Sequence, residues 1–202
     1  MKVAVTISYT KNWSGIATIC VPNAALYCAK HGYTLLATVD EYNEYDGLWK
    51  LQNVGRLLND YDLVFSFDCD TLITNHSIKL ESFLDDESDF FVCKGLNMGV
   101  FGARISGFSV DFVSTMSELI ASGKYHCEQD IISGIYLGNE IKVLDHPAFN
   151  SYLSQFYPEV PQPVTKEQGQ WEPGCFVLHV PALSIEKRIE VLKEYSQHIV
   201  YE

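Results

Sequence analysis

The fold is decided by one stretch, Leu63–Asn75, which reads LVFSFDCDTLITN. Five strand-favouring residues, LVFSF, end abruptly in two aspartates that are one residue apart, Asp68 and Asp70. This is the pattern of a buried strand whose carboxyl end opens onto a ligand site in an α/β protein. The stretch therefore predicts a central strand of an α/β sheet, with both aspartates at the edge of the sheet where ligands bind.

The two aspartates are a candidate site for a divalent cation. Side chains two residues apart in an extended chain face the same side, so we expect the carboxylates of Asp68 and Asp70 to converge. Each disfavours the charge of the other unless a cation lies between them, and oxygen ligands suit a hard ion such as Mg²⁺ or Mn²⁺. The alternative is a simple turn at a strand end. Asp60 and Asp62 form a second Asp-x-Asp without a preceding strand, and a solvated turn explains that pair.

Length and composition predict one domain over residues 1–202. The chain has 202 residues, of which 47% are hydrophobic, enough for one sizeable core. No run of about 18 apolar residues predicts a transmembrane segment, and Met1-Lys2 leads directly into a strand pattern. The six cysteines form no Cys-x-x-Cys pair, which favours free thiols. We therefore expect a cytoplasmic protein.

The charge of the chain limits its partners. The formal net charge is −12, from 26 acidic and 14 basic residues, and the basic residues form no run. Duplex nucleic acid is therefore not expected as a partner. A small anionic substrate would also be repelled unless a metal ion and a few cations neutralised it locally. This requirement agrees with a metal site at Asp68 and Asp70.

Strand and helix patterns alternate along the chain. Strands are expected over Val3–Ser8, Tyr33–Val39, Leu63–Phe67, Phe90–Cys93, Leu96–Arg104, Ile141–Leu144 and Cys175–Val180, and helices over Ser14–Lys30 (mainly from Pro22), Leu48–Leu58, Ile78–Leu84, Phe108–Ser122, 128–138 and Ile185–Tyr195. The alternation predicts an α/β fold with a mixed, mostly parallel central sheet flanked by helices. Residues 145–170 are rich in proline and predict a long loop, such as a lid.

The residues at the end of the first strand are further candidates for a binding site. In an open α/β sheet the loop after the first strand contacts ligands, so Ser8, Tyr9 and Thr10 are candidate contacts to a nucleotide. Tyr9 offers a face on which a base could stack. A tyrosine packed under the following helix explains Tyr9 equally well.

Several motifs together, in order, resemble the metal-dependent nucleotide-sugar glycosyltransferases of the GT-A fold. They are Trp49-Lys50-Leu51 before the Asp68-Cys69-Asp70 strand, Asn97-Met98-Gly99-Val100-Phe101, Glu128-Gln129-Asp130, Val177-Leu178-His179, and the run from Tyr27 to Tyr33, YCAKHGY. The sequence is most similar to the retaining branch that contains glycogenin and the bacterial and algal-virus sugar transferases. A second likeness is to the fungal and plant galactosyl- and xylosyltransferases. The likeness extends from Val3 to about Leu183.

This resemblance implies a single-domain, Rossmann-like GT-A fold and transfer of a hexose from a UDP-sugar, such as UDP-glucose or UDP-galactose, to a sugar or glycan acceptor, with retention. It implies that Asp68, Asp70 and His179 bind Mn²⁺ or Mg²⁺, that Ser8, Tyr9, Thr10, Lys50, Asp68, Asn97 and Gly99 contact the donor, and that Glu128, Gln129 and Asp130 lie near the reacting carbon. A lone histidine on an apolar strand is usually a core residue, so His179 is a candidate ligand through the resemblance alone.

The sequence also departs from the family. The glycogenin branch continues after its histidine with a glycine and a phosphate-binding lysine, whereas this chain has Val180-Pro181-Ala182-Leu183. Lys187 or Arg188 is the alternative for a phosphate contact.

Three other functions are alternatives to glycosyl transfer. A non-catalytic nucleotide-sugar-binding module is an alternative, because binding and turnover need the same metal site. A haloacid-dehalogenase-type phosphatase is disfavoured by Leu72, where its pattern has threonine or valine. A nucleotidyltransferase is disfavoured because Ser8–Ser14 is not rich in glycine.

Overall fold

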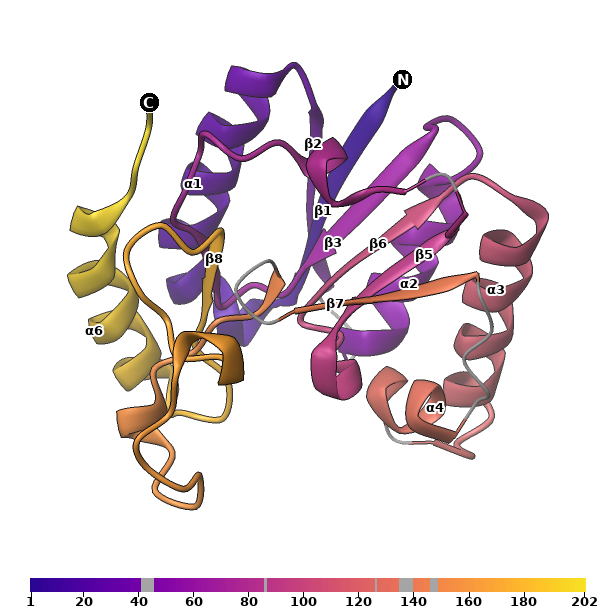
Figure 1. Cartoon of the computed structure of the whole chain (residues 1–202). Helices are drawn as coiled ribbons and strands as arrows, with labels where there is room; N and C mark the ends of the chain where they lie inside the picture. Colours follow the sequence, from indigo (N-terminus) through magenta and orange to yellow (C-terminus); the bar gives the residue numbers. More distant parts are fainter. Residues whose placement is uncertain (41–45, 86, 126, 135–139, 146–148) are drawn as a thin grey trace.

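Figure 1 shows the computed structural model of the chain, which describes residues 1–40, 46–85, 87–125, 127–134, 140–145 and 149–202. The described residues form a central six-stranded sheet in the order β2-β1-β3-β6-β5-β7. Its strands are β1 (Val3–Thr10), β2 (Thr34–Asp40), β3 (Leu63–Phe67), β5 (Phe90–Cys93), β6 (Val100–Arg104) and β7 (Ile141–Leu144).

The sheet is mixed and mostly parallel, as the sequence predicts. β1 runs parallel to β2 and β3, and β5 runs parallel to β7, whereas β6 is antiparallel to both of its neighbours. Every residue of β3 is buried, which explains why this strand is apolar throughout. β3 is therefore the central strand that the Leu63–Asn75 stretch predicts.

Helices cover both faces of the sheet (Figure 1). They are α1 (Ser14–His31), α2 (Asp46–Leu57), α3 (Gly107–Ala121), α4 (Glu128–Gly134) and α6 (Ile185–Tyr195), with 3-10 turns η1 (Lys11–Trp13), η2 (Leu80–Phe83), η3 (Lys94–Leu96), η4 (Ser154–Phe156), η5 (Lys166–Gln168) and η6 (Ser196–His198). Phe65 and Phe67 of β3 join the apolar cluster under α1 and α6, whereas Val64 joins the cluster under α2, α3 and α4. The alternation of side chains along β3 thus supplies both halves of the core.

The last strand lies outside the central sheet. β8 (Val177–His179) pairs antiparallel with β4 (Thr71–Ile73), the short strand that follows the two aspartates. In this register Thr71 lies opposite His179. The pairing brings His179 to the end of β3, although more than 100 residues separate the two strands in the chain.

Three predicted elements differ in kind or by several residues from the observed ones. The strand predicted over Leu96–Arg104 begins only at Val100, because Lys94–Leu96 form the 3-10 turn η3. α1 does not begin at Pro22; it is continuous from Ser14 with Pro22 inside it. Pro22 has no N–H to donate to the Thr18 carbonyl. Both residues face solvent, so water can replace the lost hydrogen bond. The helix predicted over Ile78–Leu84 is only a 3-10 turn. The predicted end of the 128–138 helix and residues 146–148 of the predicted loop lie outside the described residues.

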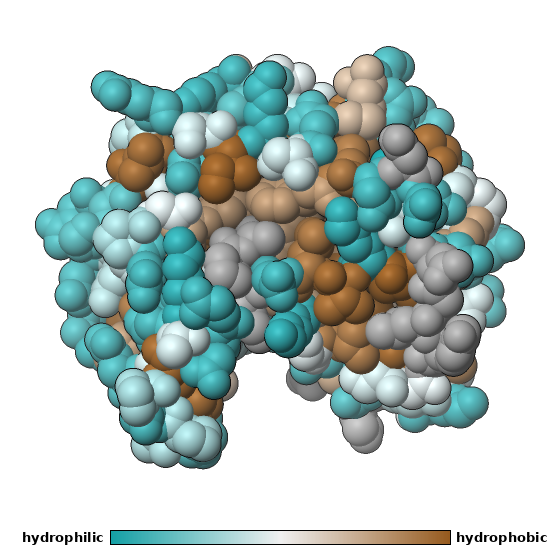
Figure 2. All heavy atoms as spheres, in the orientation of Figure 1, coloured by the Kyte–Doolittle hydropathy of each residue, from teal (hydrophilic) through white to brown (hydrophobic). Residues whose placement is uncertain are grey.

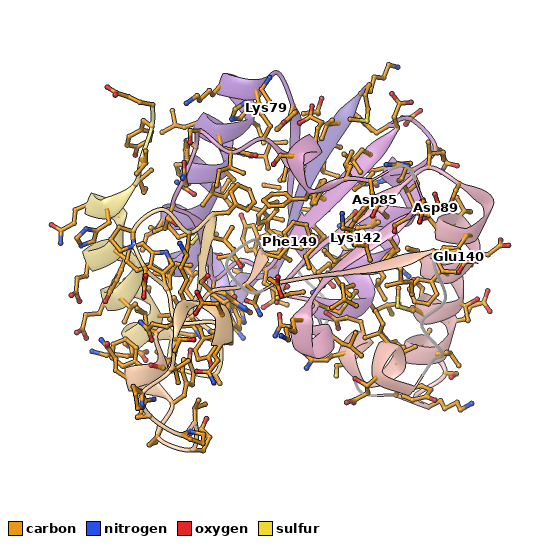
Figure 3. All side chains as sticks on the ribbon, viewed as in Figure 1. Lys79, Asp85, Asp89, Glu140, Lys142 and Phe149 are labelled. Atoms are coloured by element: carbon orange, nitrogen blue, oxygen red, sulfur yellow. The ribbon has the colours of Figure 1, made fainter. Side chains whose placement is uncertain are left out.

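The edge strand β7 is fastened to the segment before β5. Lys142 forms an ion pair with Asp85 at 3.1 Å, and Figure 3 labels both side chains. The Lys142 ammonium also donates to the Phe83 carbonyl. Beyond β7, Phe149 is fully buried with its ring against Phe65 and Phe83. These contacts anchor the chain directly before Asn150, which contacts the candidate site.

The described helices include none that is both long enough and apolar enough to cross a membrane. Hydrophilic residues cover most of the face seen in Figure 2, and brown, hydrophobic residues gather near its centre. The surface in this view is hollowed at its lower edge, between the part of the molecule that carries α6 and the part that carries α4 (Figures 1 and 2).

Candidate metal centre

The two aspartates lie in a turn rather than in an extended strand. β3 ends at Phe67, and the backbone N–H of Asp68 donates to the Gly99 carbonyl at 2.7 Å. The N–H of Thr71 then donates to the Asp68 carbonyl at 3.1 Å, which closes the turn. Cys69, between the aspartates, points into the core. The carboxylates therefore converge because the chain turns here. The alternation of side chains along an extended strand, from which their convergence was predicted, is not the cause.

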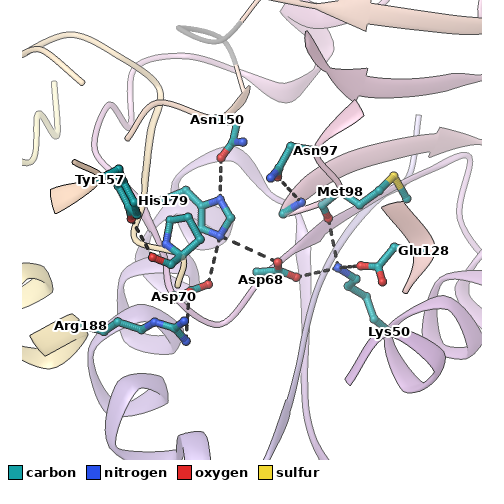
Figure 4. A network of polar contacts seen from close by, with 12 residues as sticks. Lys50, Asp68, Asp70, Asn97, Met98, Glu128, Asn150, Tyr157, His179 and Arg188 are labelled. Carbon is teal, nitrogen blue, oxygen red and sulfur yellow. Dashed lines mark hydrogen bonds and ion pairs between the residues drawn. The ribbon is translucent and has the colours of Figure 1, made fainter. Parts of the chain in front are cut away.

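Asp68, Asp70 and His179 converge at this turn (Figure 4). Their candidate ligand atoms all lie within 4.8 Å of one another. The His179 Nε2 atom lies 3.3 Å from Asp70 Oδ1 and 3.9 Å from Asp68 Oδ2. The N–H of Val180 donates to the Asp70 carbonyl at 3.1 Å, which ties the end of β8 to the turn.

The orientation of the His179 ring suits a metal ligand. Its Nδ1 lies 2.6 Å from Asn150 Oδ1. Because an amide oxygen can only accept, Nδ1 carries a proton, and Nε2, which faces the two carboxylates, is the atom that can bind a metal ion. The backbone N–H of His179 donates to the Ser151 carbonyl at 2.8 Å. The segment after β7 therefore fixes both the position and the tautomer of this histidine.

Gly99 leaves the space in which the His179 ring lies. A Cβ atom at position 99 would lie 2.8 Å from His179 Nδ1 and from Asn97 Oδ1, and closer still to His179 Cε1. The N–H of Gly99 donates to Asn97 Oδ1 at 2.7 Å. Glycine at position 99 therefore leaves room for the His179 ring, a role that was not predicted from the sequence.

Lys50 is buried among polar groups at the inner wall of the site. Its ammonium lies 2.7 Å from Asp68 Oδ1 and 2.5 Å from Glu128 Oε1, and it donates to the Met98 carbonyl at 3.1 Å (Figure 4). Burial disfavours the charge of Lys50, but the carboxylates of Asp68 and Glu128 outweigh burial and raise its pKa above the usual value. Lys50 therefore stays charged and holds Asp68 in place.

The carboxyl and imidazole groups of the site also have shifted pKa values. Burial raises the pKa of Asp68 above its usual value, although Lys50 and His179 act in the opposite direction. Burial disfavours the imidazolium of His179, but Asp70 and then Asp68 outweigh it and raise the pKa of His179. Without a metal ion, a proton thus partly balances the negative charge that these carboxylates share.

Arg188 of α6 approaches the site from the other side. Its Nη1 lies 3.4 Å from Asp70 Oδ2, and its guanidinium lies over the Trp13 ring, 4.3 Å from the ring centroid. An arginine on an aromatic face beside a carboxylate is held in one orientation. α6 thus adds a second cation to the site.

These groups line a cleft of about 360 Å³ at the carboxyl end of β3. Nine of the residues predicted for the site line it: Ser8, Lys50, Asp68, Asp70, Asn97, Gly99, Glu128, Gln129 and His179. A hollow of about 280 Å³ shares Asn97, Gln129 and Pro181 with the cleft. The cleft therefore continues into a second, smaller space.

Three predicted residues lie away from the cleft. Tyr9 and Thr10 are half-buried and belong to β1, which extends two residues further than predicted, so they do not form a loop. Asp130 is exposed on the first turn of α4 and is not among the described residues that line the cleft. Of the predicted set, these three have the weakest geometric support as donor or catalytic contacts.

Two residues of the site were not predicted from the sequence. Trp13 lines the cleft beneath Arg188, and its position shortly after the first strand was a usable signal. Asn150, which orients His179, lies inside the proline-rich stretch over residues 145–170 and belongs to no recognisable motif. Only the fold could reveal its role.

The donor set fits a Mn²⁺ or Mg²⁺ ion. Both ions bind oxygen ligands at about 2.1 Å, so two ligands of one ion lie roughly 3 to 4 Å apart, as the two histidine–aspartate distances do. An imidazole among oxygen ligands favours Mn²⁺ over Mg²⁺. The site therefore offers one nitrogen and two carboxylate ligands on an open side of the cleft.

No protein-family model matches the chain, and no curated protein matches its sequence. Solved structures do match its fold. A glycosyltransferase involved in glycosylation of the major capsid of PBCV-1 superimposes with a TM-score of 0.71 at 15% identity, covering 95% of this chain and 99% of that one. The galactosyltransferase LgtC, solved with donor and acceptor sugar analogues, gives 0.58 at 12% identity, with 95% of each chain covered.

Mouse xyloside xylosyltransferase 1 gives a TM-score of 0.57 at 9% identity, covering 90% of this chain and 98% of that one. At these identities the likeness concerns the fold. The chain thus has the fold of the GT-A glycosyltransferases, as the motifs predicted.

Proposed function

We propose that this protein is a metal-dependent glycosyltransferase that moves a hexose from a UDP-sugar, such as UDP-glucose or UDP-galactose, to a sugar or glycan acceptor with retention. The observation that carries the proposal is the convergence of Asp68, Asp70 and His179 in a cleft at the carboxyl end of β3. The fold that surrounds this cleft is shared with glycosyltransferases. Uridine, hexose and retention rest on the sequence resemblance.

The residues of the site suit the departure of a nucleoside diphosphate. A bound Mn²⁺ or Mg²⁺ would supply Lewis-acid stabilisation of the diphosphate that leaves the sugar. Asp68, Asp70 and His179 would hold that ion, with Asp68 fixed by Lys50 and His179 fixed by Asn150. Such fixed partners keep ligands in one geometry, which is what electrostatic stabilisation of a transition state requires.

Residues on the α4 side of the cleft have different expected roles. Glu128 is buried and paired with Lys50, so we assign it to positioning Lys50. Gln129 is exposed and lines both the cleft and the smaller hollow, so its amide can contact the sugar where donor and acceptor meet. Asn97 lines the same two spaces. We propose Gln129 and Asn97 as contacts of the transferred sugar.

The acceptor would enter from the smaller hollow. It is lined by Tyr152 and Tyr157, whose rings pack edge to face, and by polar groups that include Asn150 and Glu159. Aromatic faces with a few polar side chains suit the apolar and hydroxyl surfaces of a sugar ring. This assignment gives Tyr152 and Tyr157, which belong to the long loop predicted over residues 145–170, a role in acceptor binding.

Two other proposals accompany the function. All six cysteines are free thiols, which supports a reducing location such as the cytoplasm.

A non-catalytic nucleotide-sugar-binding module remains the alternative. Slow hydrolysis of the donor without an acceptor distinguishes the two, because a transferase catalyses it and a binding module does not. The observed fold is that of glycosyltransferases, so it gives no support to a haloacid-dehalogenase-type phosphatase.

Calorimetric titration with UDP tests the proposal. We expect UDP to bind the wild-type chain with Mn²⁺ and to bind at least tenfold more weakly with EDTA. Asp70→Ala should lose the metal-dependent binding, because two of the three ligands cannot hold the ion as tightly. Asp60→Ala is the matched control, since Asp60 belongs to the exposed Asp-x-Asp and should bind UDP like the wild type.

Binding that is equal in Mn²⁺ and EDTA would contradict the metal site. If wild type bound no UDP but bound GDP or ADP, the uridine donor would be wrong and the metal site would stand. If the wild type binds UDP, hydrolysis of UDP-glucose and UDP-galactose without an acceptor decides between a transferase and a binding module.

A further inference from the structure

The cleft holds two side chains of lysine or arginine among its described lining residues, Lys50 and Arg188. Lys50 has no donor left for a ligand, because its three protons are taken by Asp68, Glu128 and the Met98 carbonyl. Of the lysine and arginine side chains in the described part of the cleft, Arg188 is therefore the one with donors to spare for a ligand.

Arg188 is incompletely satisfied by the protein. Among the described residues, its guanidinium has one polar contact, the long one to Asp70 Oδ2 at 3.4 Å, and its buried Nε has no hydrogen-bond partner. The side chain is 90% buried, with 10% of its surface exposed. A guanidinium has five N–H donors, and a buried cation that uses so few of them is costly unless a ligand takes others. Trp13 holds the group in place without using a donor.

Asp70 joins this cation to the metal site. Its Oδ1 faces His179, at 3.3 Å, and its Oδ2 faces Arg188. The guanidinium and the candidate metal site are thus separated by one carboxylate and open onto the same cleft (Figure 4). An anion bound on the open side of the metal site comes within reach of the guanidinium, and a diphosphate is long enough to contact both.

We propose that Arg188 binds the diphosphate of the nucleotide sugar and neutralises the charge that grows on it as the bond to the sugar breaks. This inference rests on the proposed function. The Val180–Leu183 loop has no lysine or arginine that could contact phosphate. Arg188 of α6 provides that contact in its place. Lys187, the other candidate, is directed elsewhere: it pairs with Glu190 at 2.6 Å and lies over the Phe156 ring.

Calorimetric titrations with UDP and UMP, in Mn²⁺, test the role of Arg188. We expect Arg188→Ala to weaken UDP binding about ten- to a hundredfold, the effect of losing a charge-assisted hydrogen bond. UMP, which lacks the second phosphate, should lose less than about threefold. Arg188→Lys should bind UDP with intermediate affinity, because it keeps the charge and loses the fork. Lys187→Ala is the neighbouring control and should bind UDP like the wild type.

Titration of each variant with Mn²⁺ alone separates ligand binding from a structural role. Mn²⁺ should bind Arg188→Ala at least as tightly as the wild type, because Arg188 competes with the ion for Asp70. Arg188→Ala that loses Mn²⁺ and UDP to the same extent would overturn the inference in favour of a structural role. Thermal unfolding of Arg188→Ala and Arg188→Lys verifies that both variants are folded.

The outcomes also distinguish this inference from the proposed function. If Arg188→Ala bound UDP as tightly as the wild type while Asp70→Ala did not bind it, the inference would be wrong and the proposed function would stand. If the wild type bound GDP or ADP and no UDP, the same comparison would be made with that nucleotide. A wild-type chain that bound no nucleoside diphosphate would overturn both.

Discussion

At the residue scale, Gly99 is the position at which a single methyl group should damage the candidate site. The His179 ring fills the space that a side chain at position 99 would need. We expect Gly99→Ala to displace this ring, to weaken Mn²⁺ binding at least tenfold and to lower the free energy of unfolding by about 1–3 kcal/mol, the usual cost of overpacking. Calorimetric titration with Mn²⁺ and urea unfolding in EDTA measure the two effects.

Gly107→Ala is the matched control for that substitution. A Cβ at position 107 would meet nothing within 4 Å, and Gly107 is the first residue of α3, where alanine is a good helix former. It should bind Mn²⁺ like the wild type. Unchanged Mn²⁺ binding in Gly99→Ala would show that His179 does not ligate the ion in the observed position.

Single residues differ in how far the sequence reveals them. Asp68 and Asp70 could be found because an apolar strand ended at them, and His179 because several motifs were in the right order. Lys50 stands outside the apolar stripe of its helix, which Leu51, Val54 and Leu58 form, and yet it is 3% exposed. A lysine is buried only when charged partners neutralise it. The partners of Lys50, Asp68 and Glu128, lie far from it in the sequence, so no local pattern predicts the pairing.

At the element scale, His76 and Asn23 join α1 to the end of β4. The Asn23 side chain exchanges hydrogen bonds with the backbone of Ile73, accepting at 2.9 Å and donating at 3.0 Å, and its amide nitrogen lies 3.0 Å from His76 Nε2. Burial, and then the nearby Lys30 and His31, lower the pKa of His76 to about 4. The neutral imidazole therefore accepts from Asn23 in the folded protein.

This lowered pKa predicts a loss of stability in acid. The unfolded chain takes up a proton at His76 near the usual pKa of about 6.5, and the folded chain only near 4, so stability falls as the pH drops between these values. Between pH 7 and pH 5 the loss due to His76 should be on the order of 2 kcal/mol. Urea unfolding of wild type and His76→Gln at both pH values measures it. Both proteins would be compared in EDTA, where His179 contributes equally to each.

His76→Gln should lose less stability than the wild type on going to pH 5. Equal losses in the two proteins would mean that His76 is protonated in the folded state, contrary to its burial. His31→Gln is a useful comparison, because His31 is a partly exposed neighbour whose ring nitrogen contacts the His76 carbonyl.

Elements with a regular period were predictable, and their neighbours in space were not. The sequence predicted α6 over Ile185–Tyr195 and β5 over Phe90–Cys93, both as observed, because their apolar periods are clear. Pro22 misled the prediction of α1, since a proline on the exposed face of a long, well-packed helix breaks it less than local rules suggest. β8 was predicted as a strand, but nothing in its sequence tells that it pairs with β4.

At the scale of the whole molecule, the sequence predicted the α/β class and the mixed central sheet, because the order of strands and helices is itself a sequence property. The order of strands and helices could not predict that the candidate metal site joins segments from the two halves of the chain, and only the family resemblance grouped His179 with Asp68 and Asp70. Asp68 and Asp70 follow β3, whereas His179 and Arg188 come from β8 and α6. Such a site exists only when the entire chain is folded, so ligand binding and global stability should be linked.

The expected single domain over residues 1–202 predicts one cooperative unfolding transition. The apolar clusters on the two faces of the sheet share strands β1 and β3, so neither cluster can lose its packing while the other keeps its own. Trp171 belongs to the cluster under α1 and α6, and Trp49 lies on α2, on the opposite face. These two indoles can therefore report separately on the two faces.

Two variants, each with one tryptophan, measure whether the faces unfold together. One keeps Trp49 and carries Trp13→Phe and Trp171→Phe; the other keeps Trp171 and carries Trp13→Phe and Trp49→Phe. In each variant, the urea midpoint from tryptophan fluorescence should coincide with the midpoint from far-ultraviolet circular dichroism. A fluorescence midpoint that precedes the dichroism midpoint in only one variant would mean that the face it reports on unfolds first, and that the chain contains two stability units instead of one.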